Sequence, residues 1–342
     1  MTDPLASPVT DPTALYAVRD SLYAADMLIA AVSGLDFFTW LDEHPGTVDE
    51  IAARRGFHRR PVDVMTTLFV AMGLLERDGA RLRTTATARE HLVAQSRWYL
   101  GPYYPKVADR PIARDLIDIL RSGAPARFAS RPDEEDWHRA METETFAEEF
   151  TAAMNTRGLL TAPALAQQLD LSSRQRLLDI AGGSGVFACA MAERFTDLRA
   201  SVLEKAPVDR IAARSIARRH LADRVDTVVG DMLAEPLPHG YDVHLLSNVL
   251  HDWDEPVVRQ LLAASAQALR PGGLLIVHDT FLNATKTGPL AIAEYSVLLM
   301  HVTQGRCYSV AEIESWLGDA GFSFRGLVPS AIGRSAILAE RV

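Results

Sequence analysis

The stretch Leu177-Leu178-Asp179-Ile180-Ala181-Gly182-Gly183-Ser184-Gly185 determines the fold class that we predict for this chain. An apolar run with strand character ends in an acidic residue and a glycine-rich loop, and a segment with helical character follows. Glycine suits such a loop because a bulky side chain would keep a ligand away from the backbone N–H groups at the start of the helix. The stretch therefore predicts a strand–loop–helix unit that binds a nucleotide-like cofactor.

The sequence after this unit continues the same alternation of strands and helices. Amphipathic segments with helical spacing separate further apolar runs at residues 200–204, 226–230, 241–247 and 273–279. Such alternation favours a parallel sheet with crossover helices. The expected fold class is α/β, a doubly wound, Rossmann-like sheet.

The first hundred residues have a different character. Apolar residues recur at helical spacing in 14–38 and 62–75. Thr47, with Glu50 three residues later, is the signature of a capping box at a helix start. Polar Asp78-Gly79 between Leu75 and Leu82 indicates a small hairpin. Helix, helix and hairpin in this order form the winged-helix pattern, so we expect an all-α winged-helix domain at the N-terminus.

Charge and cysteine content narrow the class of protein. Thirty-five Lys and Arg against 44 Asp and Glu give a net charge of −9, which would repel a phosphate backbone, so nucleic acid is not an expected partner. Cys189 and Cys307 cannot form a disulfide framework, which fits a reducing compartment. The sequence shows no signal peptide and no apolar stretch of about 18 residues. We therefore expect a cytoplasmic protein without membrane association.

Two carboxylates bear on the choice of cofactor. Glu204 ends the next apolar run about 20 residues after the glycine loop, where it would accept hydrogen bonds from two ribose hydroxyls. The run 183–188 also fits the dinucleotide fingerprint G-x-G-x-x-A, which leaves an NAD-dependent oxidoreductase open. Asp179 favours S-adenosylmethionine, because a carboxylate at the mouth of the first strand would orient an ammonium group and oppose a pyrophosphate.

The motifs after the glycine loop occur in a specific order: Gly230-Asp231-Met232, then Asn248-Val249-Leu250-His251-Asp252-Trp253-Asp254-Glu255, then Pro271-Gly272-Gly273. With these motifs the chain resembles class I S-adenosylmethionine-dependent O-methyltransferases of the plant caffeate and actinobacterial natural-product type, from about residue 15 to the end. The resemblance implies methyl transfer to a hydroxyl of a small aromatic substrate. It also implies a homodimer formed through the N-terminal domain, a prediction that the apolar segment 17–38 supports.

The resemblance further implies domain boundaries and a set of cofactor-binding residues. Residues 13–100 would be the winged-helix dimerisation domain, 101–170 a helical linker with the substrate-pocket region, and 171–342 the Rossmann-like catalytic domain. The glycines would line the methionine part of the cofactor, Glu204 would hold the ribose, and Asp231 with Met232 would frame the adenine. With Asp179, the predicted set is Asp179, Gly182, Gly183, Glu204, Gly230, Asp231, Met232, Ser247 and Trp253.

His251 matches the general base of that family. A phenol with a pKa of about 10 is a poor nucleophile at neutral pH, and an imidazole can take its proton as the oxygen attacks the methyl group. The family orients this histidine with a carboxylate, and the matching position here is Asp279. The family's G-x-E-R stretch reads Gly305-Arg306-Cys307-Tyr308, so its glutamate is missing, and His301 is the candidate to take over part of that role.

Other hypotheses stay open at this point. The altered G-x-E-R stretch leaves room for transfer to carbon or nitrogen, or for a family member that binds the cofactor without transferring its methyl group. His251, Asp279 and His301 together would suit iron, although the resemblance implies no metal and we expect none. A winged-helix regulator is the alternative from another class, and its DNA-binding face would be the basic cluster Arg54, Arg55, His58, Arg59 and Arg60.

Overall fold

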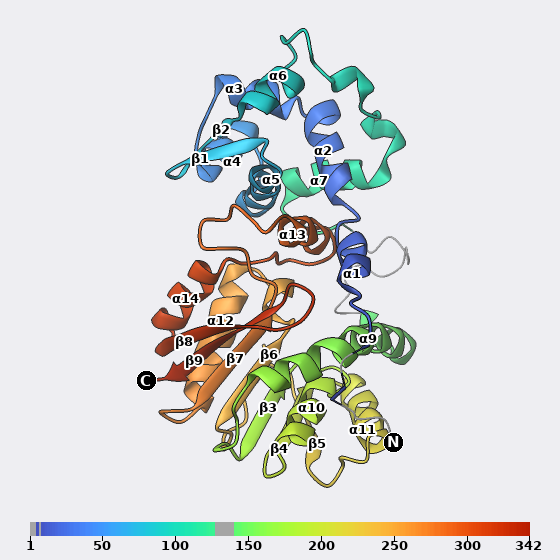
Figure 1. Ribbon diagram of the computed structural model, residues 1–342, viewed down its shortest axis with the longest axis vertical. Coiled ribbons are helices and arrows are strands. Elements are labelled where there is room, and N and C mark those ends of the chain that lie inside the picture. Colours follow the sequence, from blue (N-terminus) through green and yellow to red (C-terminus); the bar gives the residue numbers. More distant parts are fainter. Residues whose placement is uncertain (1–4, 7, 127–139) are drawn as a thin grey trace. The chain divides into compact units, whose positions relative to one another are not determined.

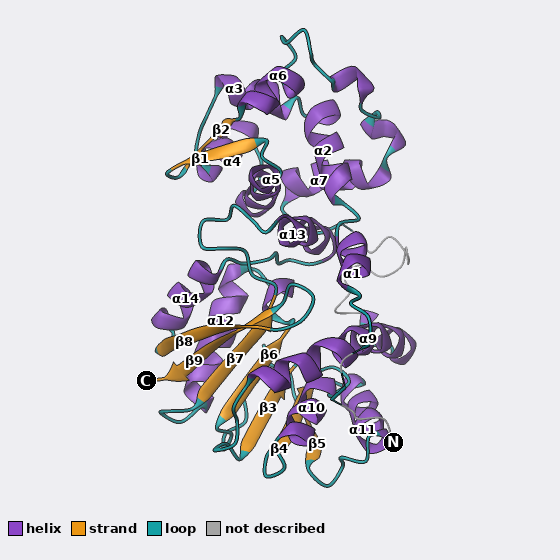
Figure 2. Cartoon of the chain, viewed as in Figure 1, coloured by secondary structure: helices purple, strands orange, loops and turns teal. Residues whose placement is uncertain are grey.

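The computed structural model describes residues 5–6, 8–126 and 140–342 (Figures 1 and 2). The chain divides into two compact units. One, which we call the sheet unit, contains residues 1–13, 130–281 and 310–342, and the other, the helical unit, contains residues 14–129 and 282–309. The later part of the sequence therefore contributes to both units.

Among the described residues, the sheet unit forms a seven-stranded sheet with the order β5-β4-β3-β6-β7-β9-β8. Strands β3 to β7 pair in parallel, and β8 and β9 add an antiparallel edge that the sequence analysis did not predict. The strands are β3 (Arg176–Ile180), β4 (Arg199–Glu204), β5 (Val225–Val229), β6 (Val243–Ser247), β7 (Leu274–Asp279), β8 (Phe322–Pro329) and β9 (Ser335–Arg341). The predicted α/β fold with a mostly parallel, Rossmann-like sheet is confirmed.

The order of the strands explains where a ligand would bind. β3 has β4 on one side and β6 on the other, so the direction of winding reverses between β3 and β6. In open α/β sheets, ligands bind at the carboxyl ends of the strands beside such a reversal. The helices of this unit are α9 (Glu144–Gln168), α10 (Val186–Arg194), α11 (Val208–Arg218), α12 (Glu255–Ala268) and α14 (Val310–Asp319).

The helical unit contains a short hairpin and a set of packed helices. The predicted order of helix, helix and hairpin is present in α4, α5 and β1–β2, and Thr47 with Glu50 forms the expected capping box. Gly56 ends α4 in a left-handed conformation, which glycine adopts without strain. The elements are α1 (Thr13–Asp20), α2 (Ala24–Ile29), α3 (Phe37–Glu43), α4 (Val48–Arg55), α5 (Arg59–Ala71), β1 (Leu75–Asp78), β2 (Arg81–Thr84), α6 (Ala86–Leu92), α7 (Pro111–Ser122) and α13 (Leu290–Val302).

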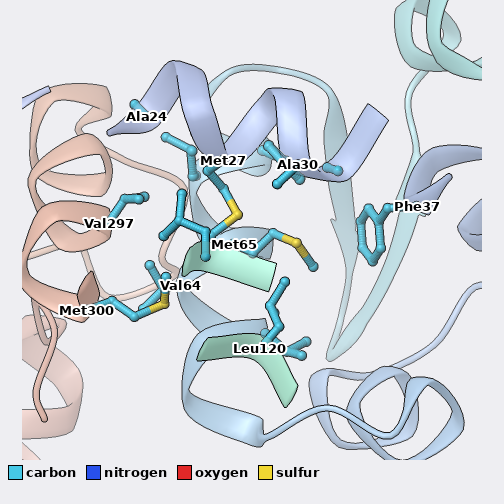
Figure 3. Packing of buried hydrophobic residues seen from close by; sticks show 14 of the residues in the cluster. Ala24, Met27, Ala30, Phe37, Val64, Met65, Leu120, Val297 and Met300 are labelled. Atoms are coloured by element: carbon cyan, nitrogen blue, oxygen red, sulfur yellow. The ribbon is translucent and has the colours of Figure 1, made fainter. Parts of the chain in front are cut away.

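Helix α13 belongs to the core of the helical unit, although it is close to the C-terminus in sequence. Figure 3 shows Val297 and Met300 of α13 beside Val64 and Met65 of α5 and Met27 of α2. Burial of these apolar side chains stabilises α13 in this position. The helical unit therefore has other bounds than the predicted winged-helix domain, because the described residues 101–126 and 282–309 group with the N-terminal helices. Residues 127–139 of the predicted linker lie outside the described residues.

Across the described residues, no single helix has the length and apolar composition needed to cross a membrane. One bent pair, Thr13–Gly34 with Phe37–Glu43, passes the same test by length and composition only.

Candidate active site

The glycine loop joins β3 to α10 at the carboxyl edge of the sheet. Asp179 is fully buried, and its Oδ2 accepts a 3.1 Å hydrogen bond from the backbone N–H of Ala188 in the first turn of α10. A Cβ on Gly182 would lie 2.6 Å from the carboxyl carbon of Asp179, so only glycine lets the loop pass this carboxylate. Oδ1 of Asp179 has no hydrogen-bond partner among the described residues.

Glu204, the last residue of β4, reaches the same loop. Its Oε1 accepts a 2.8 Å hydrogen bond from the N–H of Gly183, and its Oε2 accepts one of 3.2 Å from the N–H of Lys205. Burial raises the pKa of Asp179 and of Glu204 to about 7 each, against the opposing effect of the backbone N–H donors. Two carboxylates that bind protons unusually well therefore surround the start of α10.

These carboxylates distinguish between the two cofactor classes that the glycine pattern allows. In a dinucleotide site, the N–H groups at the helix start bind the pyrophosphate. Here the N–H groups of Gly183 and Ala188 already donate to Glu204 and Asp179, so they are not left to bind a pyrophosphate. S-adenosylmethionine carries positive charge on its sulfonium and ammonium groups and two ribose hydroxyls. This chemistry fits two carboxylates, one of which has an unpartnered buried oxygen.

The predicted adenine-side residues follow β5. The N–H of Gly230 donates to the backbone oxygen of Glu204 at 3.1 Å, which brings the ends of β4 and β5 together. Oδ1 of Asp231 accepts a 2.9 Å hydrogen bond from the N–H of Leu233, and its Oδ2 lies 3.2 Å from Nζ of Lys205. Burial raises the pKa of Asp231, but these donors outweigh burial and hold it below its usual value. Half-buried Met232 stands beside this anchored carboxylate.

His251 and Asp279 form a buried pair at the ends of β6 and β7. His251 lies in a single 3-10 turn, Leu250–Asp252, and its Nδ1 is 2.5 Å from Oδ1 of Asp279. Each residue is only 3% exposed. Burial raises the pKa of Asp279, but the imidazole, the N–H of Thr280 and the nearby Arg334 outweigh burial and hold it below its usual value. Because an ionised carboxylate only accepts, we assign the proton to Nδ1, which leaves Nε2 as the acceptor nitrogen.

Three side chains near this pair were missed in the sequence analysis. Oδ1 of Asp252 lies 3.6 Å from Nε2 of His251, and burial raises the pKa of Asp252. Nε of Arg334 donates a 2.9 Å hydrogen bond to Oδ1 of Asn248. Asp252 and Asn248 belong to the motif 248–255, which was the available signal. Arg334 gave no local signal, because the pairing of β9 with β7 places it near Asp279.

Ser247 and His278 face each other across β6 and β7. Oγ of Ser247 and Nδ1 of His278 are 2.9 Å apart, and Nδ2 of Asn248 donates to the same Oγ at 3.0 Å. Burial and the charge of Arg334 lower the pKa of His278 to about 3, so this imidazole stays neutral. Predicted cofactor residue Ser247 thus also anchors a structural histidine. Trp253, directly after the 3-10 turn, is half-buried.

His301 belongs to the helical unit rather than the sheet unit. It is 4% exposed, its Nε2 lies 3.2 Å from Oδ2 of Asp115, and its ring centroid is 4.7 Å from that of Tyr23. Burial lowers the pKa of His301, and Asp115 opposes that effect. His301 therefore has its own carboxylate partner, and its role beside His251 stays a prediction. Within the described ranges, no three or more His, Cys, Asp or Glu side chains are grouped so as to hold a metal ion.

Three residues of the basic cluster, Arg55, Arg59 and Arg60, make contacts within the helical unit. Arg55 donates to the backbone oxygen of Leu35 at 2.8 Å, and its guanidinium lies over the ring of Trp40. Arg59 pairs with Asp49 at 2.7 Å. Arg60 donates to the backbone oxygens of Gly123, Thr303 and Gly305. These contacts favour a structural role for the cluster over a DNA-binding face.

Comparison with known proteins identifies the family. Residues 114–323 match the O-methyltransferase domain family. The chain is 34% identical to 3-hydroxy-5-methyl-1-naphthoate 3-O-methyltransferase from Streptomyces sahachiroi, with 91% of this chain and 90% of that protein covered. It is 31% identical to the N,N-dimethyltransferase OxyT from Streptomyces rimosus, with 95% and 94% covered. A crystal structure of an O-methyltransferase family 2 protein from Planctomyces limnophilus with apigenin gives a TM-score of 0.89 at 32% identity, covering 100% and 99%. This chain belongs to the S-adenosylmethionine-dependent O-methyltransferase family.

Proposed function

We propose that the protein methylates a phenolic hydroxyl of a small aromatic natural product, with His251 as the general base. The observation that carries the proposal is the buried 2.5 Å contact between Nδ1 of His251 and Oδ1 of Asp279. A carboxylate that holds the Nδ1 proton orients the ring and makes Nε2 the basic nitrogen. The hydroxynaphthoate methyltransferase and the apigenin-bound structure support an aromatic acceptor.

The residues at the carboxyl edge of the sheet fit the parts of the cofactor. When bound, S-adenosylmethionine supplies an activated methyl group on a sulfonium sulfur. We assign Glu204 to the ribose hydroxyls and Asp179 to the ammonium group, because each offers a carboxylate at the glycine loop. Gly182 and Gly183 leave the backbone of that loop open to the methionine part. The remaining predicted residues at this edge are Gly230, Asp231, Met232, Ser247 and Trp253.

His251 moves one proton in the proposed reaction. Nε2 would accept the hydroxyl proton as the substrate oxygen takes the methyl group that the cofactor supplies, and S-adenosylhomocysteine would leave with the electron pair of the broken carbon–sulfur bond. The resulting imidazolium is stabilised through Nδ1–H by ionised Asp279, whose pKa is held low in the folded protein. Such base catalysis contributes about 10²–10⁴ to the rate, and alignment of oxygen, carbon and sulfur supplies the rest.

Labelled S-adenosylmethionine tests the proposal directly. The purified protein is incubated with methyl-¹³C cofactor and a panel of hydroxynaphthoic acids, flavones including apigenin, simple phenols, aryl amines and 2-oxo acids. The products are then examined by mass spectrometry and NMR. We expect the label in an aryl methyl ether, because the His251–Asp279 pair is arranged to deprotonate a hydroxyl. Label found exclusively on nitrogen or carbon would contradict O-methylation.

Transfer to nitrogen is the second candidate function. Cys307 stands where the family resemblance places a glutamate, and its fully buried side chain brings no carboxylate to that position. The relative OxyT is an N,N-dimethyltransferase, so this branch of the family includes nitrogen acceptors. In the labelled product, an N-methyl group and an O-methyl group have different carbon shifts, which separates the two functions.

We also propose that two copies associate through α1. The apolar segment 17–38, expected to be exposed, is largely buried in the core of the helical unit from Ala24 onward. Leu15 and Val18 of α1 are 76% and 70% exposed, and Leu22, two residues after the end of this helix, is 56% exposed. Leu15 and Val18 are three positions apart on a helix that buries no residue, and with Leu22 they form an exposed apolar stripe. A second copy would cover this stripe in a homodimer.

Charges placed in the stripe are expected to separate the dimer. The double variant Leu15→Glu, Val18→Glu should elute at the monomer mass in size exclusion with light scattering, because burying two carboxylates in an apolar interface is unfavourable. Val9→Glu is the control, since Val9 is fully exposed outside the stripe, and should keep the dimer mass. A monomer mass for the unaltered protein would refute the proposal.

We propose the cytoplasm as the place of action on the basis of the two cysteines. Cys189 and Cys307 are both buried, and neither forms a disulfide within the described part of the chain. Burial raises the pKa of the Cys189 thiol to about 12, so this cysteine is neither a disulfide partner nor a reactive thiol. The described fold does not depend on a disulfide bond, so it does not require an oxidising compartment.

A further inference from the structure

Arg334 is a buried cation beside the His251–Asp279 pair. It lies in the turn between β8 and β9 and is 2% exposed. The antiparallel pairing of β7 with β9 places Ser335 opposite Asp279, so Arg334 is next to the end of the strand that carries the carboxylate. Burying a guanidinium is costly unless its charge and its donors are compensated. The surroundings of Arg334 therefore need an explanation.

One part of the explanation is a hydrogen bond to the turn that carries His251. Nε of Arg334 donates to Oδ1 of Asn248 at 2.9 Å. Asn248 has a left-handed backbone with a φ of 56°, and its N–H donates to the backbone oxygen of His278 at 2.8 Å. The 3-10 turn with His251 begins two residues later. Arg334 thus binds Asn248, which lies two residues before the start of this turn.

The other part is electrostatic. The charged or titratable groups around Asp279 are His251 and Asp252 from the 3-10 turn, His278 from β7 and Arg334 from the β8–β9 turn, while Arg157 from α9 acts on Asp252 and His278. The guanidinium of Arg334 lowers the pKa of both Asp279 and His278. It therefore favours an ionised Asp279 and a neutral His278.

We propose that Arg334 is a positioning residue for the general base: its buried positive charge lies next to the strand end that carries Asp279, and its hydrogen bond to Asn248 holds the turn that presents His251. An isolated pair of carboxylate and imidazole retains its shared proton to a higher pH. A third, positive charge releases that proton at lower pH, which widens the range in which His251 can act as a base. The effect on catalysis rests on the proposed function of His251 as a base. The electrostatic effect of Arg334 on the His251–Asp279 pair does not.

The test is the NMR titration of histidine imidazoles in protein labelled with ¹³C-histidine, with His251→Asn used to identify the His251 signal. In Arg334→Met, the titration midpoint of His251 should rise by about one pH unit, because the repelling charge is gone. Arg334→Lys keeps the charge and should restore the unaltered midpoint. Asn248→Gly retains the left-handed backbone and should leave the midpoint in place, but broaden or split the signal as the turn loosens.

Arg341→Met is the matched control. Arg341 is on β9, and its donors bind the backbone oxygens of Ala266 and Gly321 rather than the active-site groups. This variant should leave the His251 midpoint unchanged. If Arg334→Met does not fold, Arg334→Gln keeps a donor without the charge and should show the same rise.

An unchanged midpoint in the folded neutral variant would overturn the proposal. The outcome is separable from the proposed function, which the turnover of His251→Asn tests. A raised midpoint together with retained turnover in His251→Asn would support the coupling and remove His251 as the base. If His251→Asn loses turnover but the His251 midpoint does not rise in Arg334→Met, only the role of Arg334 is overturned.

Discussion

Methyl transfer by the variant His251→Asn is expected to be about 10²–10⁴-fold slower than by the unaltered protein, while the affinity for S-adenosylmethionine stays the same. The asparagine amide can donate to Asp279 in place of Nδ1–H, so the local structure is retained. The amide has no basic nitrogen, so the hydroxyl proton has no acceptor at this position. Initial rates at saturating cofactor and calorimetric titration with S-adenosylmethionine measure the two effects.

His244→Asn is the matched control for this prediction. His244 is fully buried on β6, its Nδ1 lies 2.8 Å from Oγ of Ser265, and burial lowers its pKa to about 3. It is a histidine of similar burial on the strand that leads to the His251 turn, and it has no role in the proposed reaction. Its replacement should reduce stability and leave the rate per folded molecule unchanged. Equal loss of rate in both variants would indicate destabilisation rather than loss of a base.

Asp179→Asn is expected to stabilise the ligand-free protein and weaken cofactor binding. Burial raises the pKa of Asp179 from 3.8 to about 7. The unfolded chain releases this proton near pH 4 and the folded chain near pH 7, so ionisation lowers stability progressively between about pH 4 and 7, and fully above pH 7. Asparagine removes this cost. Its Nδ2 takes the place of an unpartnered buried oxygen, and the cost of burying this amide offsets part of the gain. We therefore expect a net gain in the free energy of unfolding of about 1–3 kcal/mol at pH 8.

The same substitution removes the charge that we assign to the ammonium group of the cofactor. Loss of a charge-assisted hydrogen bond should weaken binding of S-adenosylmethionine by about 10–100-fold. Chemical denaturation at pH 5 and pH 8 and calorimetric titration measure the two opposite effects, and the gain in stability should be smaller at pH 5.

Asp242→Asn provides the comparison at the other end of the sheet. This carboxylate is 5% exposed, and its two oxygens accept hydrogen bonds from the N–H groups of Gln175 and Arg176. Its replacement should cost stability and leave cofactor affinity unchanged, because Asp242 lies directly before β6 and binds the start of β3, whereas the glycine loop follows the end of β3. A loss of stability in Asp179→Asn would show that its carboxylate stabilises the ligand-free fold.

The local features of this protein were predictable from sequence because they depend on neighbouring residues. The glycine loop after β3 requires a residue without Cβ at position 182, and this requirement is visible in the sequence itself. The capping box of Thr47 and Glu50 is a contact between residues three positions apart. Each parallel strand is a short apolar run whose carboxyl end lies at the same edge of the sheet, which is why the motifs at the ends of β3 to β7 indicated one site.

The partners of the active-site residues depended on longer-range packing. His251, His278 and His301 are the same residue type, and only their surroundings separate them. His251 meets a carboxylate, His278 a hydroxyl in a neutral buried site, and His301 a carboxylate in the helical unit. The division into units also differs from the prediction at α13, which groups with the N-terminal helices. An apolar helix can pack against any complementary apolar surface, so its periodicity does not predict which surface it contacts.

The sequence by itself determined the α/β fold and the glycine loop, because hydrophobic periodicity, glycine content and short motif spacing act over a few residues. The pairing of His251 with Asp279 was predicted from the family resemblance. The tertiary structure alone decided that α13 joins the N-terminal helices and that β8 and β9 close the sheet with Arg334 beside Asp279. The physical reason is that burial and charge are properties of contacts between distant segments. Such contacts exist only after the chain has folded.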